Sequence, residues 1–314
     1  MWKKNKNRGV LFEPVDDKDY IFGASKIIDN ITMSGDWIAY LGRGEKQRIK
    51  LETMACVSYS ANNCLETIFN YQMDHNMISE GGLQWLEDMG YMEGGEVNLS
   101  DRFLAVTSGT TKKGNTGKKV AQAMHEKGCI PESDYPFPDT YSWSEYYKLL
   151  EPELFDIAAD FNERFLINYE TVYERDFEEA LKHSPLQVYV HAWEKPVDGI
   201  YERTDKTINH AVEMHVSKWE IFDSYEKYDS FVKNLAPDFD FYNIGYKYKL
   251  TEIMPETNVK VLKDKNSNTV GYFLPAIDSS AFRSMGANFG ISVPLKDGET
   301  NWSKVEIDGE YEIT

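Results

Sequence analysis

The hydrophobic pattern of this chain changes from helical to strand-like part-way along its 314 residues, and this change restricts the fold more than any other feature. Apolar residues recur at three- and four-residue spacing from Leu51 to Gln72, which predicts an amphipathic helix, and a second helix is predicted from Asn115 to Glu126. From Leu186 to Ala192 the residues alternate and are rich in β-branched and aromatic types, which predicts a strand. A helix-rich half followed by a strand-rich half indicates an α+β protein with a cleft where the halves meet.

The same pattern divides the chain into three parts. Residues 1–35 show little periodicity and are interpreted as an N-terminal lead-in, whereas residues 36–250 carry the helices and strands of the main domain. Short strand-like runs then restart between turn signals, so residues 251–314 are predicted to form a small β-rich C-terminal appendage. The further strands predicted within the main domain cover residues 211–216, 219–222 and 242–250.

Composition excludes several kinds of partner. Asp and Glu total 52 against 34 Lys and Arg, a formal charge of −18, which repels phosphate backbones and anionic lipids. Nucleic acid and membrane surfaces are therefore not expected as partners. The polar, basic start of the chain lacks the apolar stretch of a signal peptide, and three cysteines are too few for a disulfide framework. We expect a protein of a reducing compartment, the cytoplasm, that is not secreted through a signal peptide.

Cys56, His210 and Asp223 occupy positions that favour nucleophilic catalysis. Cys56 lies at the start of a predicted helix, where the positive end of the helix dipole stabilises a thiolate and is expected to lower the thiol pKa. His210 begins a predicted strand and Asp223 ends another, so a base and a carboxylate to orient it are both present. A cysteine on an apolar helix face is also an ordinary packing residue, so the residues alone leave both interpretations open.

Six short segments, in order, resemble motifs of the papain-like cysteine peptidases. The segment around Cys56 resembles the family's Cys-Trp-Ala-Phe-Ser, with Glu66 at the same offset as the family's Glu. Asn209 to Val212 resembles Asp-His-Ala-Val around the catalytic histidine, and Asp223 to Tyr225 resembles Asn-Ser-Trp in the form found in a divergent bacteriophage and bacterial branch. The other three segments are residues 99–104, 128–137 and 184–190.

The resemblance implies roles for individual residues, including some where this chain departs from the family. Asp223 stands where most members have Asn, and Lys50 stands where the oxyanion-hole Gln is expected, so Gln47 is the nearest candidate for that donor. The substrate-binding Gly-Gly corresponds to the region Gly114-Asn115-Thr116-Gly117, whose backbone is expected to pair with an extended peptide. About fifty residues precede Cys56, so the long inhibitory propeptide of secreted relatives is not expected.

The resemblance as a whole implies a two-lobed papain-like fold and a cysteine peptidase. Such an enzyme hydrolyses amide bonds of a polypeptide substrate through a Cys-His-Asp triad and a thioester acyl-enzyme, with no cofactor. No metal is expected either, because His125 and Cys129 have a ligand-like spacing but no second pair accompanies them.

An inactive protein that keeps this fold is the alternative. It would be a structural or docking component of a phage particle, located in the virion or the host cytoplasm, and would bind other virion proteins through residues 251–314. A cleft filled by the chain's own side chains favours this alternative, and a sulfur of Cys56 beside His210 favours the enzyme.

Overall fold

The computed structural model contains two compact units, residues 1–252 and 253–314. In the first unit the described residues are 9–23, 34–138, 142–148, 150–191, 195–203, 207–216, 220–225 and 231–252, and Ile253 of the second unit is described as well. In the second unit the backbone of five strands is described.

Helix α1, Cys56–Asp74, is the central element of the first unit and is buried along most of its length. Its N-cap residue Ala55 offers no side chain to the first turn, so the backbone N–H groups there stay available to other acceptors. Side-chain hydroxyls of Ser79, Ser100 and Thr116 cap three other helices. The remaining helices are α2 Glu80–Asp88, α3 Asp101–Thr107, α4 Gly117–Lys127, α5 Trp143–Tyr146, α6 Pro152–Arg164 and α7 Phe177–Ala180, with short 3-10 turns at Ile38–Tyr40, Glu132–Asp134 and Glu174–Asp176.

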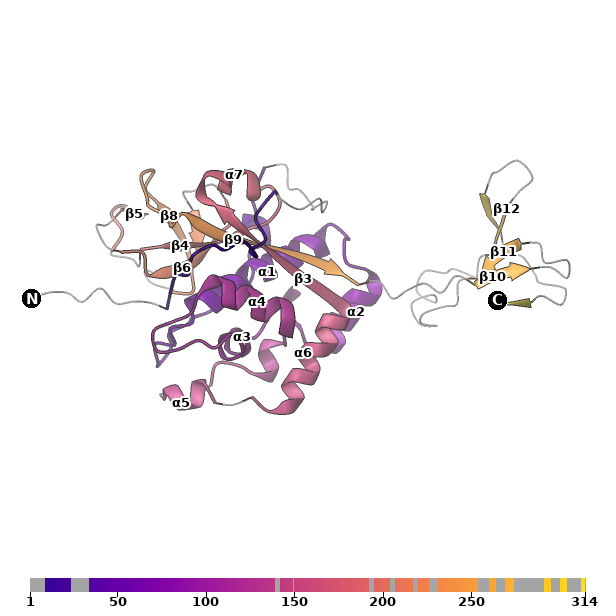
Figure 1. Cartoon of the computed structure of the whole chain (residues 1–314), viewed down its shortest axis with the longest axis horizontal. Coiled ribbons are helices and arrows are strands. Elements are labelled where there is room, and N and C mark those ends of the chain that lie inside the picture. Colours follow the sequence, from indigo (N-terminus) through magenta and orange to yellow (C-terminus); the bar gives the residue numbers. More distant parts are fainter. Residues whose placement is uncertain are drawn as a thin grey trace, which may run out of the picture. The chain divides into compact units, whose positions relative to one another are not determined.

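A mixed sheet of seven strands, in the order β3-β9-β4-β6-β7-β8-β5, packs against α1. All neighbouring strands are antiparallel except β5 and β8, which are parallel. The strands are β3 Phe165–Tyr173, β4 Leu186–Val190, β5 Ile200–Tyr201, β6 His210–Met214, β7 Glu220–Phe222, β8 Val232–Leu235 and β9 Ile244–Glu252, and a separate hairpin pairs β1 Met92–Glu93 with β2 Glu96–Val97. Figure 1 shows α3 to α6 on one side of this sheet and α7 on the other.

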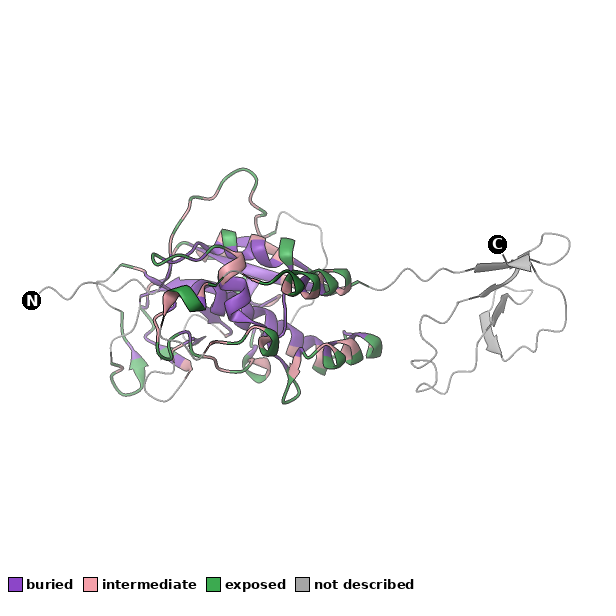
Figure 2. Ribbon diagram, turned by 90° about the horizontal axis from the view of Figure 1, so that it is seen from below, coloured by how far each residue is buried: buried purple, intermediate pink, exposed green. Residues whose placement is uncertain are grey.

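Side chains of alternate residues along the strands enter two apolar clusters. Tyr189 and Ala211 join the cluster that contains the inner face of α1, whereas Val188 and Val212 join a second cluster with Trp37 and α7. In Figure 2 the buried residues run through the middle of the first unit, along α1 and the sheet. The two clusters therefore fix the start of α1 against the start of β6.

The second unit contains a five-stranded antiparallel sheet in the order β13-β12-β11-β10-β14. Its strands are β10 Lys260–Lys263, β11 Thr269–Phe273, β12 Ile291–Pro294, β13 Thr300–Ser303 and β14 Glu312–Ile313. Helices combined with a large mixed sheet confirm the predicted α+β class. Within the part of the chain that is described, no helix is long and apolar enough to cross a membrane.

Candidate active site

Cys56 is the first residue of α1 and its side chain is fully buried. The backbone N–H groups of Ala211 in β6 and of Val57 in the first helical turn act on this sulfur and favour its thiolate form. Ala211 follows His210, so the sulfur lies at the start of the strand that carries the predicted base. Met54 approaches the helix with a left-handed backbone, φ 61°, which completes the sharp turn into α1.

The thiol of Cys56 does not have the lowered pKa that its helix position predicts. Burial raises the pKa of Cys56, and the carboxylates of Glu52 and Asp223 raise it further, while the two backbone N–H groups act in the opposite direction. In this closed arrangement the thiol is therefore protonated, because the loss of water outweighs the helix dipole.

His210 and Asp223 are joined by a hydrogen bond of 2.6 Å between Nε2 and Oδ1, with both side chains fully buried. Strands β6 and β7 pair Glu213 with Phe222, and this register, continued by one step, places Asp223 diagonally opposite His210. Burial alone would raise the pKa of Asp223, but His210 and Lys233 outweigh it and bring that pKa to about 2. An ionised carboxylate only accepts hydrogen bonds, so Nε2 carries the proton and Nδ1 is left as the basic nitrogen.

Lys233 is a charged residue of this site that the sequence analysis does not identify. Its Nζ lies 2.9 Å from Asp223 Oδ2 and donates to the backbone oxygen of Tyr225 at 2.6 Å. Lys233 comes from β8, which carries no family motif. The one signal in the sequence is Asp223 itself, since a buried carboxylate in place of an amide calls for a counter-charge.

Gln47 is brought to the site although nine residues separate it from Cys56. Its backbone N–H donates to the oxygen of Ser224, and its side-chain Oε1 accepts from the Ser224 hydroxyl at 2.8 Å. Its Nε2 donates to Glu52 Oε1 and to the Tyr225 hydroxyl, both at 2.9 Å. Lys50, at the family's usual spacing for the oxyanion Gln, is exposed.

Glu52 thus accepts a hydrogen bond from the candidate oxyanion donor Gln47, and its charge acts on the Cys56 thiol. The Tyr225 hydroxyl also donates to the Glu52 carboxylate, at 2.7 and 2.6 Å to its two oxygens. A carboxylate held by an amide and a hydroxyl beside the nucleophile resembles a bound oxyanion in charge and in hydrogen bonding. The Tyr225 ring lies edge-on to His210, at 5.2 Å between centroids, at the position of the family's Trp.

The region from Gly114 to Gly117 presents one backbone edge beside the site. Thr116 caps α4, and Gly117 has no room for a side chain because a Cβ there would lie 1.8 Å from the Tyr189 hydroxyl. Asn115 donates its backbone N–H to Gly9 at 2.8 Å and accepts from the N–H of Leu11 at 2.7 Å. The edge is therefore paired with an extended segment, which is the chain's own lead-in.

We call residues 9–12 the cleft segment, because they pair with Asn115 in the predicted substrate-binding region and lie against Met54 in the loop before Cys56. Val10 is buried in the same apolar cluster as Cys56, and the Phe12 ring packs on Tyr242 at 4.0 Å between centroids. Gly9 lies so close to the loop before the nucleophile that a Cβ would stand 2.1 Å from the Met54 carbonyl oxygen. A segment of the lead-in is thus packed against the loop before the nucleophile and paired with the region that was predicted to bind substrate.

The other candidate residues lie apart from this site. Cys64 and Cys129 are buried, and burial raises the pKa of both thiols. His125 bonds to the backbone oxygen of Ile167 and His215 to Glu220. Across the described ranges no group of three or more His, Cys, Asp or Glu could hold a metal ion.

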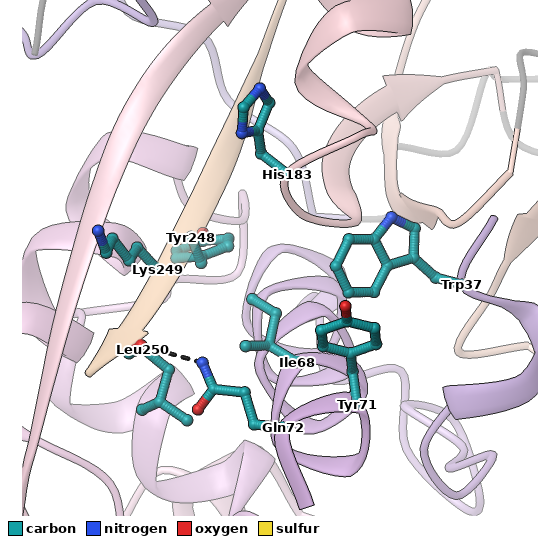
Figure 3. Close-up of a pocket in the computed structure, with 8 residues that line it drawn as sticks. All are labelled: Trp37, Ile68, Tyr71, Gln72, His183, Tyr248, Lys249 and Leu250. Carbon is teal, nitrogen blue, oxygen red and sulfur yellow. Dashed lines mark hydrogen bonds between the residues drawn. The ribbon is translucent and has the colours of Figure 1, made fainter. Parts of the chain in front are cut away.

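A small cavity further along α1 is not part of the site (Figure 3). It has a volume of about 20 Å³, room for roughly one water, and is lined by Ile68, Tyr71 and Gln72 of α1 among others. Twelve residues of helix place Ile68 roughly 18 Å from Cys56. Its one drawn hydrogen bond, from Gln72 to the Leu250 oxygen, holds α1 to β9.

Comparison with known proteins yields likenesses in structure but none in sequence. No family model matches the chain, and no curated protein is similar to it in sequence. Xylellain, a cysteine protease from Xylella fastidiosa, is similar in structure, with 13% identity and a TM-score of 0.52 over 81% of this chain and 99% of that chain.

Two further structures have lower TM-scores. Digestive procathepsin L 3 from the larval midgut of Tenebrio molitor has a TM-score of 0.47 at 14% identity, over 77% of this chain and 76% of that chain. A structure from work on the mite allergens Blo t 1 and Der p 1 has a TM-score of 0.43 at 13% identity, over 74% of each chain.

Proposed function

Because the chain has the papain-like peptidase fold, we propose that it is a cysteine peptidase that hydrolyses amide bonds of a polypeptide substrate. Cys56 is the nucleophile, His210 the base and acid, and Asp223 the residue that orients His210. The observation that carries the proposal is the 2.6 Å bond between His210 and Asp223 at the strand start where the Cys56 sulfur is bound. Acyl transfer requires a thiol, an imidazole and a group that orients the imidazole, and the bonded pair of His210 and Asp223 supports the last two of these roles.

The reaction follows from these positions. Nδ1 of His210 takes the thiol proton, and the Cys56 thiolate attacks the scissile carbonyl to form a tetrahedral oxyanion. The Cys56 backbone N–H and Gln47 Nε2 are the donors for that oxyanion once Glu52 has turned away. The imidazolium of His210 then protonates the leaving amine, which leaves a thioester. Water, deprotonated by His210, attacks the thioester and releases the acid and the thiol.

Substrate binding is proposed at the backbone edge of Asn115. An extended polypeptide offers the same N–H and carbonyl groups that Gly9 and Leu11 present to Asn115. Both cannot occupy one edge, so the cleft segment must leave before a substrate enters. Its departure also readmits water to Cys56, which removes the main cause of the raised thiol pKa.

A second candidate function is supported by the filled cleft. Gly9 packs against Met54, two residues before Cys56, and Val10 is buried in the same apolar cluster as Cys56, as a protein that keeps the fold without its chemistry allows. In that case the chain is a docking component of a phage particle, and the unit from Ile253 to Thr314 contacts other virion proteins. The hydrogen bond between His210 and Asp223 favours the enzyme, since a docking protein has no need of an oriented imidazole.

Covalent labelling tests the proposed function. The full chain and its Gly9→Ala variant are treated with an epoxysuccinyl cysteine-protease inhibitor, and adducts are counted by intact mass and located by peptide mapping. We expect one adduct, at Cys56. The labelling rate of Gly9→Ala/His210→Ala should be about 100-fold lower than that of Gly9→Ala, which is the usual cost of losing an acid–base group.

The controls for labelling are internal to the protein. Cys64 and Cys129 are equally buried thiols without an imidazole partner and should stay unlabelled. The Gly9→Ala/Cys56→Ala variant should acquire no adduct. A folded Gly9→Ala protein that reacts at no cysteine, or reacts equally fast without His210, contradicts the proposal and favours the docking role.

A further inference from the structure

A lysine and a carboxylate form a fully buried ion pair directly behind the imidazole of His210. Lys233 Nζ lies 2.9 Å from Asp223 Oδ2, and the other carboxylate oxygen accepts the bond from His210. The three side chains come from three neighbouring strands. The pairing of Ile221 with Lys233 places Lys233 diagonally opposite Asp223, as Asp223 is to His210.

The lysine is held in place by more than the charge of its partner. Its ammonium also donates to the Tyr225 carbonyl at 2.6 Å, and the same Nζ lies over the Tyr201 ring, 6.0 Å from the centroid. Because Nζ bonds to both Asp223 and Tyr225, it fixes the carboxylate relative to the loop that follows β7. Oδ1 is thereby kept directed at Nε2 of His210.

The charge balance of this pair differs from that of a carboxylate alone. An isolated carboxylate buried against an imidazole is compensated most easily when the imidazole is protonated. With Lys233 present, Asp223 is neutralised from its other side, and His210 contacts a pair with no net charge. An amide at position 223 would present the same neutral acceptor without a counter-charge.

We propose that Lys233 is a positioning residue of the site, which lets Asp223 serve as a neutral hydrogen-bond acceptor for His210. The effect of Lys233 on catalysis rests on the proposed function. Its effect on the protonation of His210 does not. Among the described residues, the titratable groups bonded to or packed on His210 are Asp223 and Tyr225, from the end of β7 and the loop after it. Lys233 from β8 and Glu52 lie one bond further away, on Asp223 and on Tyr225, and the Cys56 thiol of α1 is influenced by Asp223 and Glu52.

Four variants test this role in the Gly9→Ala protein: Lys233→Met, Asp223→Asn, the two together, and Lys247→Met. Lys247 is the matched control, because it is also a buried lysine paired with a carboxylate, Glu170 at 2.8 Å, on a different strand. The measurement is the pH dependence of the rate at which iodoacetamide alkylates Cys56.

In Lys233→Met the uncompensated carboxylate favours the imidazolium form of His210. The alkaline limb, meaning the part of the pH–rate profile where His210 loses this proton, should therefore move up by about one pH unit or more. The double variant restores a neutral acceptor, and its limb should return to that of the parent. Asp223→Asn alone strands a buried ammonium and should have the lowest melting temperature of the set. Lys247→Met should lower the melting temperature without moving the limb.

An unmoved limb in Lys233→Met, or a double variant that is no closer to the parent, overturns the proposal. If Lys233→Met fails to fold, the double variant decides alone, since it must be folded and keep the parent's limb. If Cys56 does not react in any variant, a second measurement remains: the ¹⁵N chemical shifts of the His210 ring during a pH titration. An identical titration in parent and Lys233→Met overturns the role of Lys233, whereas failed labelling with a shifted titration overturns only the proposed function.

Discussion

Gln47 and Glu52 determine at the residue scale whether the site can hold an oxyanion. Gln47 Nε2 is directed toward the site by Ser224, yet Glu52 and Tyr225 accept its two N–H groups. Glu52 is only partly buried, so it can turn toward solvent, whereas Gln47 is fully buried and fixed at both ends of its amide. The structure therefore places a buried donor, Gln47, beside a partly exposed carboxylate that competes for that donor.

Gln47→Ala should lower the rate of peptide hydrolysis about 100-fold, the usual cost of one lost oxyanion donor. Alkylation of Cys56 by iodoacetamide forms no oxyanion, so its rate should change by less than about 3-fold if the thiol environment is kept. Both rates are measured on the same preparation. Equal losses in the two assays would show that Gln47 supports the fold of the loop and not the oxyanion.

Sequence reasoning identifies the residues of the site unequally. Cys56, His210 and Asp223 lie in local motifs, and the structure places them at the start of α1, at the start of β6 and directly after β7, with His210 bonded to Asp223. Gln47 could be selected only by assuming a longer loop before Cys56, because its position is fixed by hydrogen bonds to Ser224, which is 177 residues away. Lys233 and Glu52 reach the site only through strand pairing and loop geometry, which no local pattern encodes.

The start of α1 and the cleft segment act together at the scale of elements. The predicted helix begins at Leu51 because the apolar spacing extends that far, but the left-handed Met54 delays the observed helix to Cys56. This turn presents the Met54 carbonyl to Gly9, whose φ of 127° lies outside the range that other residues adopt readily. The cleft segment thus depends on the absence of a side chain at Gly9.

Gly9→Ala should release the cleft segment and raise the alkylation rate of Cys56 at least 10-fold, because the new Cβ collides with the Met54 carbonyl oxygen. The rate is measured by intact mass at fixed reagent concentration. Gly23→Ala is the matched control: Gly23 also has a positive φ, 81°, but a Cβ there meets nothing within 4 Å. Equal rates in the two variants would mean that the segment does not restrict access to the thiol.

Elements that depend on distant pairing are the ones that sequence patterns miss. The predicted strands that correspond to β4, β6, β7 and β9 are confirmed, and their ends differ from the observed ends by two residues or fewer, since their alternation is local. Strand β3 is not among the predicted strands, and its nine pairs with β9 join residues about eighty apart. The pairing of Val10 with Asn115 is likewise non-local. The phage branch and the role of the unit from Ile253 to Thr314 stay predictions.

Buried carboxylates control stability at the scale of the whole molecule. Burial raises the pKa of Glu213 to about 8, against a bond from Thr67, and burial together with Glu45 raises that of Glu132 to about 8. Burial also raises the pKa of Glu66 and Asp101. A raised carboxyl pKa stabilises the fold fully below the unfolded value of about 4.5, and that contribution is lost as pH rises through about 8.

The melting temperature should therefore fall between pH 5 and pH 8.5. Asp223, with a pKa of about 2, acts in the opposite direction but only below about pH 3.8, outside this window. Burial lowers the pKa of His191 and His215, which also act in the opposite direction but only below about pH 6.5. In Glu213→Gln the free energy of unfolding should fall less steeply with pH, by about 1.4 kcal/mol per pH unit, which is the effect of one proton. The exposed Glu163→Gln serves as control and should keep the parent's slope. A melting temperature that rises toward pH 8.5 would contradict the protonated state of these groups.

Hydrolysis by the protein with an opened cleft tests the central claim most directly. A mixture of fluorogenic peptides is offered to Gly9→Ala, Gly9→Ala/Cys56→Ala and Gly9→Ala/His210→Ala, each checked for folding by circular dichroism. The account predicts turnover by Gly9→Ala and a loss of about 1,000-fold or more in both double variants. A folded Gly9→Ala protein without turnover, or turnover that persists without Cys56, would contradict the assignment of this chain as a cysteine peptidase.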